Sequence, residues 1–126
     1  MKIRKASVKD FPAIRKLIRE YPHKLLQDHL PRSSRFFVAI EEGRVVGCCA
    51  LEIYSKRLAE VRSLVVKKEF QGQGIASKLV ERCIAEAKKK GVYELLGITG
   101  AVKLFEKHGF ATFKGEKYAL LKILGD

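Results

Sequence analysis

The chain reads Gln71-Gly72-Gln73-Gly74-Ile75-Ala76 at the point where a predicted strand gives way to a predicted helix. The β-branched apolar run 61–66 precedes this stretch, and apolar residues at helical spacing follow it over 77–90. Two glycines at such a junction let backbone N–H groups approach a ligand at the positive end of the helix dipole. No Asp or Glu falls between Gly72 and Val80 to neutralise that end. The stretch therefore predicts a site for an external anion, and a phosphate suits it.

The size of the chain predicts one domain with a substantial core, because 126 residues are enough for one and too few for two. Apolar residues make up 47% and charged residues 32%, which is ordinary for a soluble globular protein. No apolar run approaches the ~20 residues of a membrane-spanning helix. Asp10 and Pro12 stand where a signal peptide would have its apolar stretch, so we expect a cytoplasmic protein without a membrane partner.

The three cysteines, Cys48, Cys49 and Cys83, all lie in apolar segments. Two of them are adjacent and their number is odd, so they cannot make a disulfide framework. Their spacing is not that of a zinc site either. We therefore expect reduced core residues and no metal.

The net charge of +12 has two interpretations. A strongly basic chain attracts polyanions, so one alternative is a nucleic-acid-binding module. The other is a lysine-rich solvated surface whose field draws in small anionic ligands. The basic residues are scattered along the sequence, and no basic arm or aromatic-interleaved motif gathers them. This favours the second interpretation, in which nucleic acid is not the main partner.

Hydrophobic periodicity predicts the element order β-α-α-β-β-β-α-β-α-β-β. Strands are expected over 2–6, 36–40, 45–54, 58–66 and 92–98, and a terminal hairpin over 111–113 and 117–124. Helices are expected over the apolar stripe 14–21, over 23–31, over 77–90 and over 101–108. This order predicts an α/β (α+β) layer fold with a mixed sheet.

The glycine motif matches neither of two common nucleotide-binding patterns. No Gly-Lys-Ser/Thr follows at the spacing of a Walker A loop. The run Gly72-x-Gly74-x-x-Ser77 lacks the third glycine of a dinucleotide fingerprint, and it follows an antiparallel meander instead of opening the fold. Glu94 lies at about the right distance for a ribose-binding acid, but it falls inside the next predicted strand. A tight strand-to-helix turn with nothing bound remains an alternative for so short a motif.

The flanks of the motif resemble a known family. The stretch 59–76 is similar to motif A of the GNAT family of N-acetyltransferases, whose pattern is Gln/Arg-x-x-Gly-x-Gly/Ala, and Gln71, Gly74 and Ala76 fill its three fixed positions. The segment Leu104–Phe110 looks like the second signature of the family, a short helix that ends in Gly-Phe. The resemblance covers the whole chain in element order. It implies a single GNAT domain over 1–126, with a mostly antiparallel seven-stranded mixed sheet flanked by about four helices.

The resemblance also implies an acyltransferase that takes acetyl-CoA as co-substrate. The amides of 72–77 are expected to hold the CoA pyrophosphate, and the backbone of 64–66 to pair with the pantetheine. A β-bulge is expected to splay this strand from 92–98 and to admit the thioester, whose carbonyl the amide near Leu64 can polarise. The implied coenzyme-binding residues are Leu64, Val65, Val66, Gln71, Gly72, Gln73, Gly74, Ile75, Ala76, Ser77 and Phe105.

Acetyl transfer to an amine requires a group that takes the proton of the amine. Glu60 is the candidate, because the resemblance implies a glutamate base on this strand, in phase with Arg62, Leu64 and Val66. The alternative is a strand glutamate that pairs with a neighbouring Lys or Arg. Many members of the family carry a tyrosine as general acid where this chain has Phe105, so Phe105 is expected to pack against the pantetheine instead. His108 is expected to interact with the helix dipole and to take no catalytic part.

The acceptor is indicated by a closer likeness. The run 59–64, together with Thr99 and Phe105, resembles the acetyltransferase domain of N-acetylglutamate synthases. An arginine at position 62 offers a planar fork for a substrate carboxylate, and Arg62 and Thr99 are therefore the candidate substrate-binding residues. The alternative is that Arg62 pairs with an acidic neighbour.

We expect an enzyme that acetylates the α-amine of a free amino acid such as glutamate. The alternatives are a protein or peptide N-acetyltransferase, and a basic CoA- or nucleic-acid-binding module without turnover. A homodimer is common in the family and is a possible state of this chain.

Overall fold

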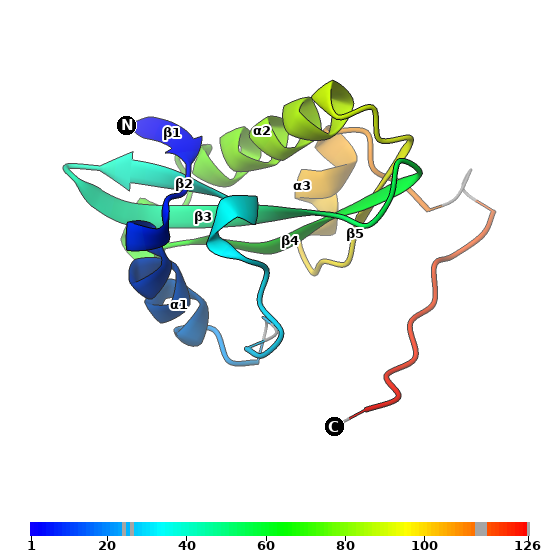
Figure 1. Ribbon diagram of the computed structural model, residues 1–126, viewed down its shortest axis with the longest axis horizontal. Helices are drawn as coiled ribbons and strands as arrows, with labels where there is room; N and C mark the ends of the chain where they lie inside the picture. The colour runs from blue at the N-terminus through cyan, green and yellow to red at the C-terminus, as the bar shows by residue number, and fades with distance from the viewer. Residues whose placement is uncertain (24, 26, 113–115, 126) are drawn as a thin grey trace.

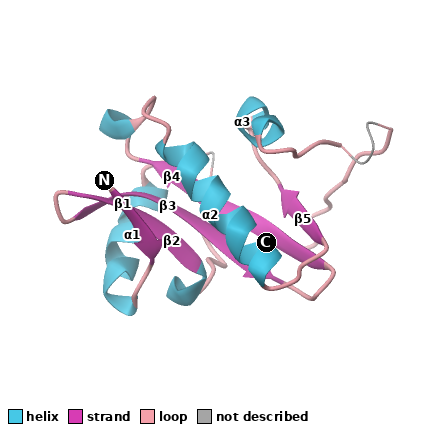
Figure 2. Ribbon diagram, turned by 90° about the horizontal axis from the view of Figure 1, so that it is seen from above, coloured by secondary structure: helices cyan, strands magenta, loops and turns pink. Residues whose placement is uncertain are grey.

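The computed structural model describes residues 1–23, 25, 27–112 and 116–125. A central sheet has helices on both of its faces (Figures 1 and 2). Within the described residues the sheet has five strands in the order β1-β2-β3-β4-β5. They are β1 (Lys2–Lys5), β2 (Phe36–Glu41), β3 (Arg44–Ile53), β4 (Leu58–Val66) and β5 (Glu94–Gly97). Only β4 and β5 pair in parallel, so the sheet is mixed, as predicted.

Three α-helices cover the sheet. They are α1 (Phe11–Arg19), α2 (Ile75–Lys89) and α3 (Val102–Lys107). Pro12 lies in the first turn of α1, where its missing N–H leaves no helical hydrogen bond unmade. The helix α2 is the crossover between the parallel strands β4 and β5, as a parallel connection requires.

The core is divided between the two faces of the sheet. On one face, α1 packs against buried residues of the strands, with Ile14, Leu17 and Ile18 as its contribution. On the other face, α2 packs through residues that include Ile75, Leu79 and Cys83. All three cysteines are buried and free, which confirms their prediction as core residues. The sheet thus presents two chemically separate faces, and any site on it belongs to one or the other.

The helix predicted over 23–31 was wrong. The described residues of this segment form turns and bends between the bracketing Pro22 and Pro31. The side-chain amide of Gln27 donates to the carbonyl oxygens of Ile18 and Leu25 at 3.1 Å and of Tyr21 at 3.3 Å. Two of these carbonyls lie at or just past the end of α1, so one side chain fixes the loop there without a second helix.

The predicted terminal hairpin is also absent from the part of the chain that the structure describes. Residues 113–115 of the prediction lie outside the described residues, and 116–125 contain one isolated bridge at Lys117 and no strand. Figure 1 shows this end of the chain extending away from the layers. An alternating apolar sequence forms a strand only when a ladder partner is present. The described chain therefore has five strands and three α-helices, and the expectation of seven and about four was wrong.

Candidate functional site

The loop before α2 has the backbone that its glycines allow. Gly72 and Gly74 both have φ of +81°, and Gly74 is the N-cap residue of α2. A Cβ placed on either glycine meets no atom of the described part of the chain within 4 Å. Glycine is needed here for the left-handed backbone, and the space beside it is open. The loop therefore leaves room for a ligand directly at the start of the helix.

The N-terminal end of α2 is uncapped. No side chain of the described residues caps it, and its first turn holds no acidic residue. The amide of Lys78 makes the first helical hydrogen bond, to the Gly74 carbonyl oxygen at 3.2 Å. The amides of Ile75, Ala76 and Ser77 precede it, and such groups need partners from outside the helix. Free amides and the positive end of the dipole together suit a phosphate.

The Gln71 side chain braces this loop. Its amide donates to the Val66 carbonyl oxygen at 2.9 Å and to the Tyr21 hydroxyl at 3.1 Å. The loop is thereby fixed to the end of β4 and to the segment after α1. The side-chain amide of Gln71 is thus already hydrogen-bonded within the protein. Gln71 therefore shapes the anion site by fixing the backbone of the loop.

The strand β4 contains the predicted bulge. Cys48 of β3 pairs with Val65, whereas the next registered pair is Ala50 with Arg62. Ser63 and Leu64 therefore stand opposite Cys49 alone. Ser63 has φ of +54°, and its carbonyl oxygen accepts a hydrogen bond from Cys48 Sγ at 3.4 Å. A non-glycine residue held in this conformation at a candidate site marks a backbone that its surroundings enforce.

The bulge reverses the alternation of side chains along β4. Before it, Ala59 and Val61 pack on the α2 face, which leaves Glu60 and Arg62 on the α1 face. After it, Leu64 and Val66 pack on the α2 face and Val65 on the α1 face. The expectation that Glu60 and Arg62 share a face with Leu64 and Val66 was therefore wrong, because one extra residue inverts the period of two.

The strands β4 and β5 pair only over their first residues. The parallel register runs from Leu58 opposite Glu94 to Val61 opposite Gly97, where β5 ends. The strand β4 continues to Val66. Within the described residues, the portion of β4 from Arg62 onward therefore has β3 on one side and no ladder partner on the other. An extended ligand can add to such an edge through main-chain hydrogen bonds.

Phe105 and Thr99 both lie beyond the end of β5. Phe105 is buried, and its ring lies against Gly97 so closely that a Cβ there would stand 2.6 Å from Phe105 Cε2. The Thr99 hydroxyl accepts a hydrogen bond from the Ala101 amide at 2.9 Å and fixes the turn into α3. Phe105 therefore packs against the strand end, and Thr99 has a local backbone partner. The expected contact of Phe105 with the pantetheine stays a prediction.

Glu60 has a partner that the sequence did not indicate. The Tyr54 hydroxyl donates to Glu60 Oε1 at 2.5 Å, and Glu52 is the register partner of Glu60 across the β3–β4 pair. Burial, and then the carboxylate of Glu60, raise the pKa of Tyr54 to about 12, so the phenol remains a donor at neutral pH. Tyr54 immediately precedes the turn into β4, and the hairpin register is the signal that places it near Glu60.

Arg62 is the next residue along β4 on the same face as Glu60. Its side chain is half-buried, and its charge acts on Tyr54 against the effect of Glu60. No ion pair of the described residues involves Arg62 or Glu60. The Tyr54 hydroxyl thus holds the carboxylate of Glu60. The guanidinium of Arg62 follows on the same face of β4 and has no counter-ion among the described residues. This arrangement can bind a zwitterion and take a proton from its amine.

Comparison with known proteins follows the same lines. A family model, the acetyltransferase (GNAT) domain, matches residues 32–112, which is more than half of the chain. The chain belongs to the GNAT family. It is an acyltransferase with N-acetyltransferase activity, and acetyl-CoA is its co-substrate. The open glycine loop and the uncapped amides of α2 fit such a group, because neither needs a side chain to reach a phosphate.

Individual GNAT proteins are similar over most of the chain. An uncharacterized N-acetyltransferase of Chlorobaculum tepidum is 32% identical over 92% of this chain and 79% of its own length. An amino-acid acetyltransferase of Mycobacterium tuberculosis is 30% identical over 90% of this chain and 70% of its own length.

Two crystal structures resemble the fold closely. A Mycobacterium tuberculosis protein in complex with CoA superposes with a TM-score of 0.84 at 30% identity, over 90% of this chain and 73% of that chain. The N-acetylglutamate synthase of Neisseria gonorrhoeae, complexed with coenzyme A and N-acetyl-glutamate, superposes with a TM-score of 0.79 at 28% identity. This superposition covers 89% of this chain and 28% of the synthase chain.

Two further expectations concern groups beyond the site. No helix among the described residues is long and apolar enough to cross a membrane. The same residues contain no cluster of three or more His, Cys, Asp or Glu side chains suited to a metal ion.

Proposed function

We propose that this protein transfers the acetyl group of acetyl-CoA to the α-amine of a free amino acid such as glutamate. The observation that carries the proposal is the pair Glu60 and Arg62, adjacent on the α1 face of β4 and without an internal ion pair within the described residues. The similarity to an amino-acid acetyltransferase and to an N-acetylglutamate synthase supports the same acceptor class.

The donor side of the reaction belongs to the backbone. In this proposal the amides from Gly72 to Ser77 hold the CoA pyrophosphate, and residues 64–66 of β4 hold the pantetheine along their open edge. Bound acetyl-CoA supplies an acetyl group activated as a thioester. The amide near Leu64, in the bulge, is the donor that polarises the carbonyl oxygen of that group.

The acceptor side belongs to side chains. Arg62 binds the acceptor carboxylate with its planar fork, and Thr99 lies beyond the strand end as a second polar contact. Glu60 takes the proton that the ammonium must lose before its nitrogen can attack. Tyr54 orients the carboxylate of Glu60 for this task. Phe105 has no proton to give, so it shapes the site by packing.

An acceptor panel read by thiol release tests this function. Glutamate, aspartate, lysine and peptides with a free N-terminus are supplied with acetyl-CoA, and CoA thiol is measured. We expect release with free amino acids, and with glutamate in particular. Release with peptides alone would contradict the acceptor class, whereas tight CoA binding without release for any amine would favour a binding module.

Arg62→Lys and Arg62→Met supply the matched comparison. The lysine variant keeps the charge and loses the bidentate geometry, and the methionine variant loses both. We expect the KM for the amino acid to rise in the order wild type, lysine variant, methionine variant, with the CoA dissociation constant unchanged. Equal KM values in the three proteins would remove Arg62 from acceptor binding.

A further inference from the structure

One side-chain hydrogen bond joins the first turn of α2 to the end of α3. Ser77 Oγ lies 2.7 Å from His108 Nε2, and both residues are half-buried. Ser77 is the third residue of α2, and its amide is one of those that precede the first helical hydrogen bond. His108 directly follows α3, and its amide donates to the Phe105 carbonyl oxygen at 3.0 Å. A titratable ring is therefore one hydrogen bond away from the candidate anion site.

The protonation state of His108 decides what the Ser77 hydroxyl can do. In neutral imidazole, Nε2 is either an acceptor of the serine hydrogen or a donor to its oxygen, depending on the tautomer. In imidazolium, Nε2 can only donate. The Ser77 hydroxyl hydrogen is then free to point elsewhere. Because side chains in a helix lean toward its N-terminal end, that direction leads to the anion site at the start of α2.

We propose that His108 is a positioning residue that couples proton binding to coenzyme binding through Ser77. The proposal rests on the proposed function, which puts the CoA pyrophosphate at the N-terminal end of α2. Protonated His108 holds Ser77 as a donor toward the phosphate and adds a positive charge close to it. Coupling of this kind is reciprocal, so bound CoA makes His108 a stronger base and acid makes CoA bind more tightly.

Other ionisable groups near this bond do not duplicate its role. On α2, Lys78 and Glu81 line a surface cavity together with Met1 and Ile3, so they face β1. On α3, the ionisable residues Lys103, Glu106 and Lys107 are all exposed to solvent, which screens them. In the loop before α2, Lys68 and Glu69 are exposed as well. Of these groups, His108 is the one whose side chain hydrogen-bonds Ser77.

The test is an NMR titration of the histidine rings with and without CoA, alongside CoA dissociation constants from about pH 8 to about pH 5.5, a range that spans an ordinary histidine titration. We expect CoA to move the midpoint of the His108 titration upward. We also expect wild-type affinity to rise on acidification about threefold to tenfold more than the affinity of His108→Gln. The comparison with the variant is essential because a phosphate monoester itself titrates in this range.

The control variants separate charge from structure. His108→Gln keeps a hydrogen-bonding side chain for Ser77 and removes the titration, and Ser77→Ala keeps the ring and removes the relay. His23→Gln removes a different, exposed histidine and is expected to behave as wild type. Both His108→Gln and Ser77→Ala should lose the extra acid dependence of CoA affinity.

The outcomes distinguish this inference from the function on which it rests. If CoA binds and the His108 midpoint does not move, the coupling is wrong while the coenzyme site stands. The same conclusion follows if wild type and His108→Gln show one pH dependence. If CoA does not bind at any pH, the proposed function fails together with the coupling. The wild-type titration alone is decisive if a variant does not fold.

Discussion

Glu60 is the residue on which the proposed chemistry depends. Replacing it with Gln keeps its shape and removes the carboxylate that accepts the amine proton. We expect kcat/KM to fall by about 100-fold or more, which is the usual size of a general-base contribution. The rise in rate with pH that reflects its ionisation should disappear. The measurement is a pH–rate profile of thiol release, and a variant profile that matches the wild type would remove Glu60 from the base role.

Tyr54 allows a finer test of the same residue. Tyr54→Phe deletes only the hydroxyl that donates to Glu60 Oε1 at 2.5 Å. A carboxylate that loses this donor is no longer held in one orientation, so kcat should fall while the KM for the amino acid stays unchanged. The loss of kcat should be smaller than in Glu60→Gln. Because the pKa of Tyr54 is raised to about 12, the wild-type hydrogen bond persists throughout the neutral range. An unchanged kcat in the variant would mean that Tyr54 does not position the base.

Sequence reasoning at the residue scale succeeded where one position fills one local role. Gly74 and the buried cysteines follow from neighbours a few residues away. Tyr54 was missed because its contact with Glu60 depends on the hairpin register. The occupied side chain of Gln71 was missed for a similar reason, since its partner Tyr21 is distant in the chain. Contacts of this kind appear only once the strands and helices are arranged in space.

At the scale of elements, the loop before α2 can be tested with a pair of glycine variants. Gly74 and Gly43 both have positive φ, and a Cβ on either meets no atom within 4 Å. Gly74→Ala and Gly43→Ala should therefore each destabilise the fold by about 1–2 kcal/mol, the cost of a left-handed alanine. Gly43 lies in the β2–β3 turn, away from α2.

Only Gly74→Ala should weaken CoA binding, because its methyl group lies at the candidate phosphate site. Urea denaturation gives the stability of each variant, and calorimetric titration gives its affinity for CoA. If the two variants lose affinity equally, the effect comes from general destabilisation, and the loop does not bind the phosphate.

The junction of β1 with α1 provides a second test at this scale. Arg4 hydrogen-bonds Asp10, with an Arg4 Nη1 to Asp10 Oδ2 distance of 2.7 Å, and the amide of Ser7 donates to the same carboxylate. The guanidinium first, and then the amide of Ser7, lower the pKa of Asp10 to about 2 from its usual 3.8, against the opposing effect of burial. The stabilisation is fully present above pH 3.8 and is lost as pH falls through about 2.

Asp10→Asn should therefore lower the free energy of unfolding by about 1–2 kcal/mol at neutral pH, after allowance for the partly exposed Arg4. The difference from wild type should vanish in strong acid. Urea denaturation as a function of pH is the measurement, with Glu20→Gln, an exposed residue just after the same helix, as control. A difference that does not change with pH would assign the effect to something other than this ion pair.

Element order was largely predictable, and the exceptions have physical causes. Strongly periodic segments such as 58–66 and 77–90 formed the strand and helix expected, because their apolar residues select one face. The segment 23–31 was mispredicted as a helix because Gln27 supplies the hydrogen bonds that close the loop. The bulge was expected from the family resemblance. The resemblance did not indicate the reversal of faces that the bulge produces. This reversal puts Glu60 and Arg62 on the opposite face from Leu64 and Val66.

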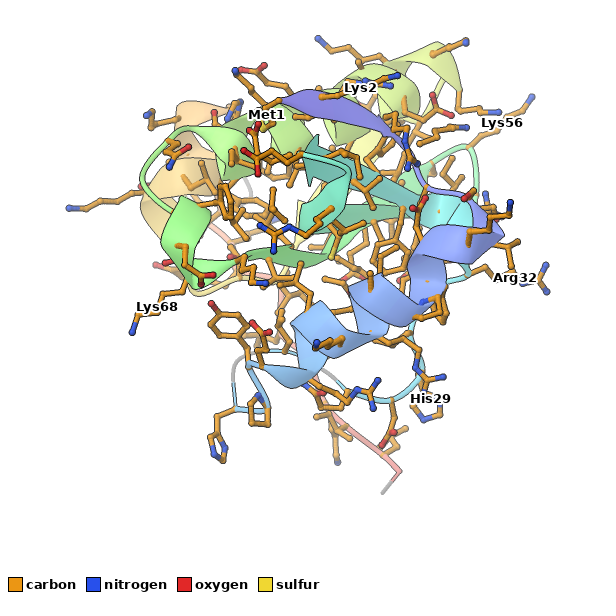
Figure 3. The ribbon with its side chains drawn as sticks, turned by 90° about the vertical axis from the view of Figure 1, so that its left-hand side faces the viewer. Met1, Lys2, His29, Arg32, Lys56 and Lys68 are labelled. Carbon is orange, nitrogen blue, oxygen red and sulfur yellow. The ribbon has the colours of Figure 1, made fainter. Side chains whose placement is uncertain are left out.

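On the scale of the whole molecule, the chain carries a net charge of +12. Figure 3 shows Lys2, Arg32, Lys56 and Lys68 at separate places on the periphery, carried by different parts of the chain. Positive charge carried at separate places creates a general attraction for anions. It is consistent with CoA as the anionic ligand, since its phosphates gain from a positive field before they reach α2.

The layered architecture gives the proposed reaction its two sides. Donor binding is assigned to the start of α2 and to residues 64–66, whereas the acceptor residues Glu60 and Arg62 belong to the α1 face. The bulge at Ser63 lies between them along one strand. In the proposed reaction, a single irregularity in β4 thus separates the donor-binding residues from the acceptor side chains along one strand.

The most direct test of the proposed function is to identify which of two acceptors the protein acetylates. The purified protein is incubated with isotopically labelled acetyl-CoA and an equimolar mixture of glutamate and a peptide with a free N-terminus, and the products are identified by mass spectrometry. The account predicts label on the α-amine of glutamate, at a rate that falls in Glu60→Gln and Arg62→Met. Label on the peptide alone, or label on glutamate that is unaffected by both variants, would contradict it.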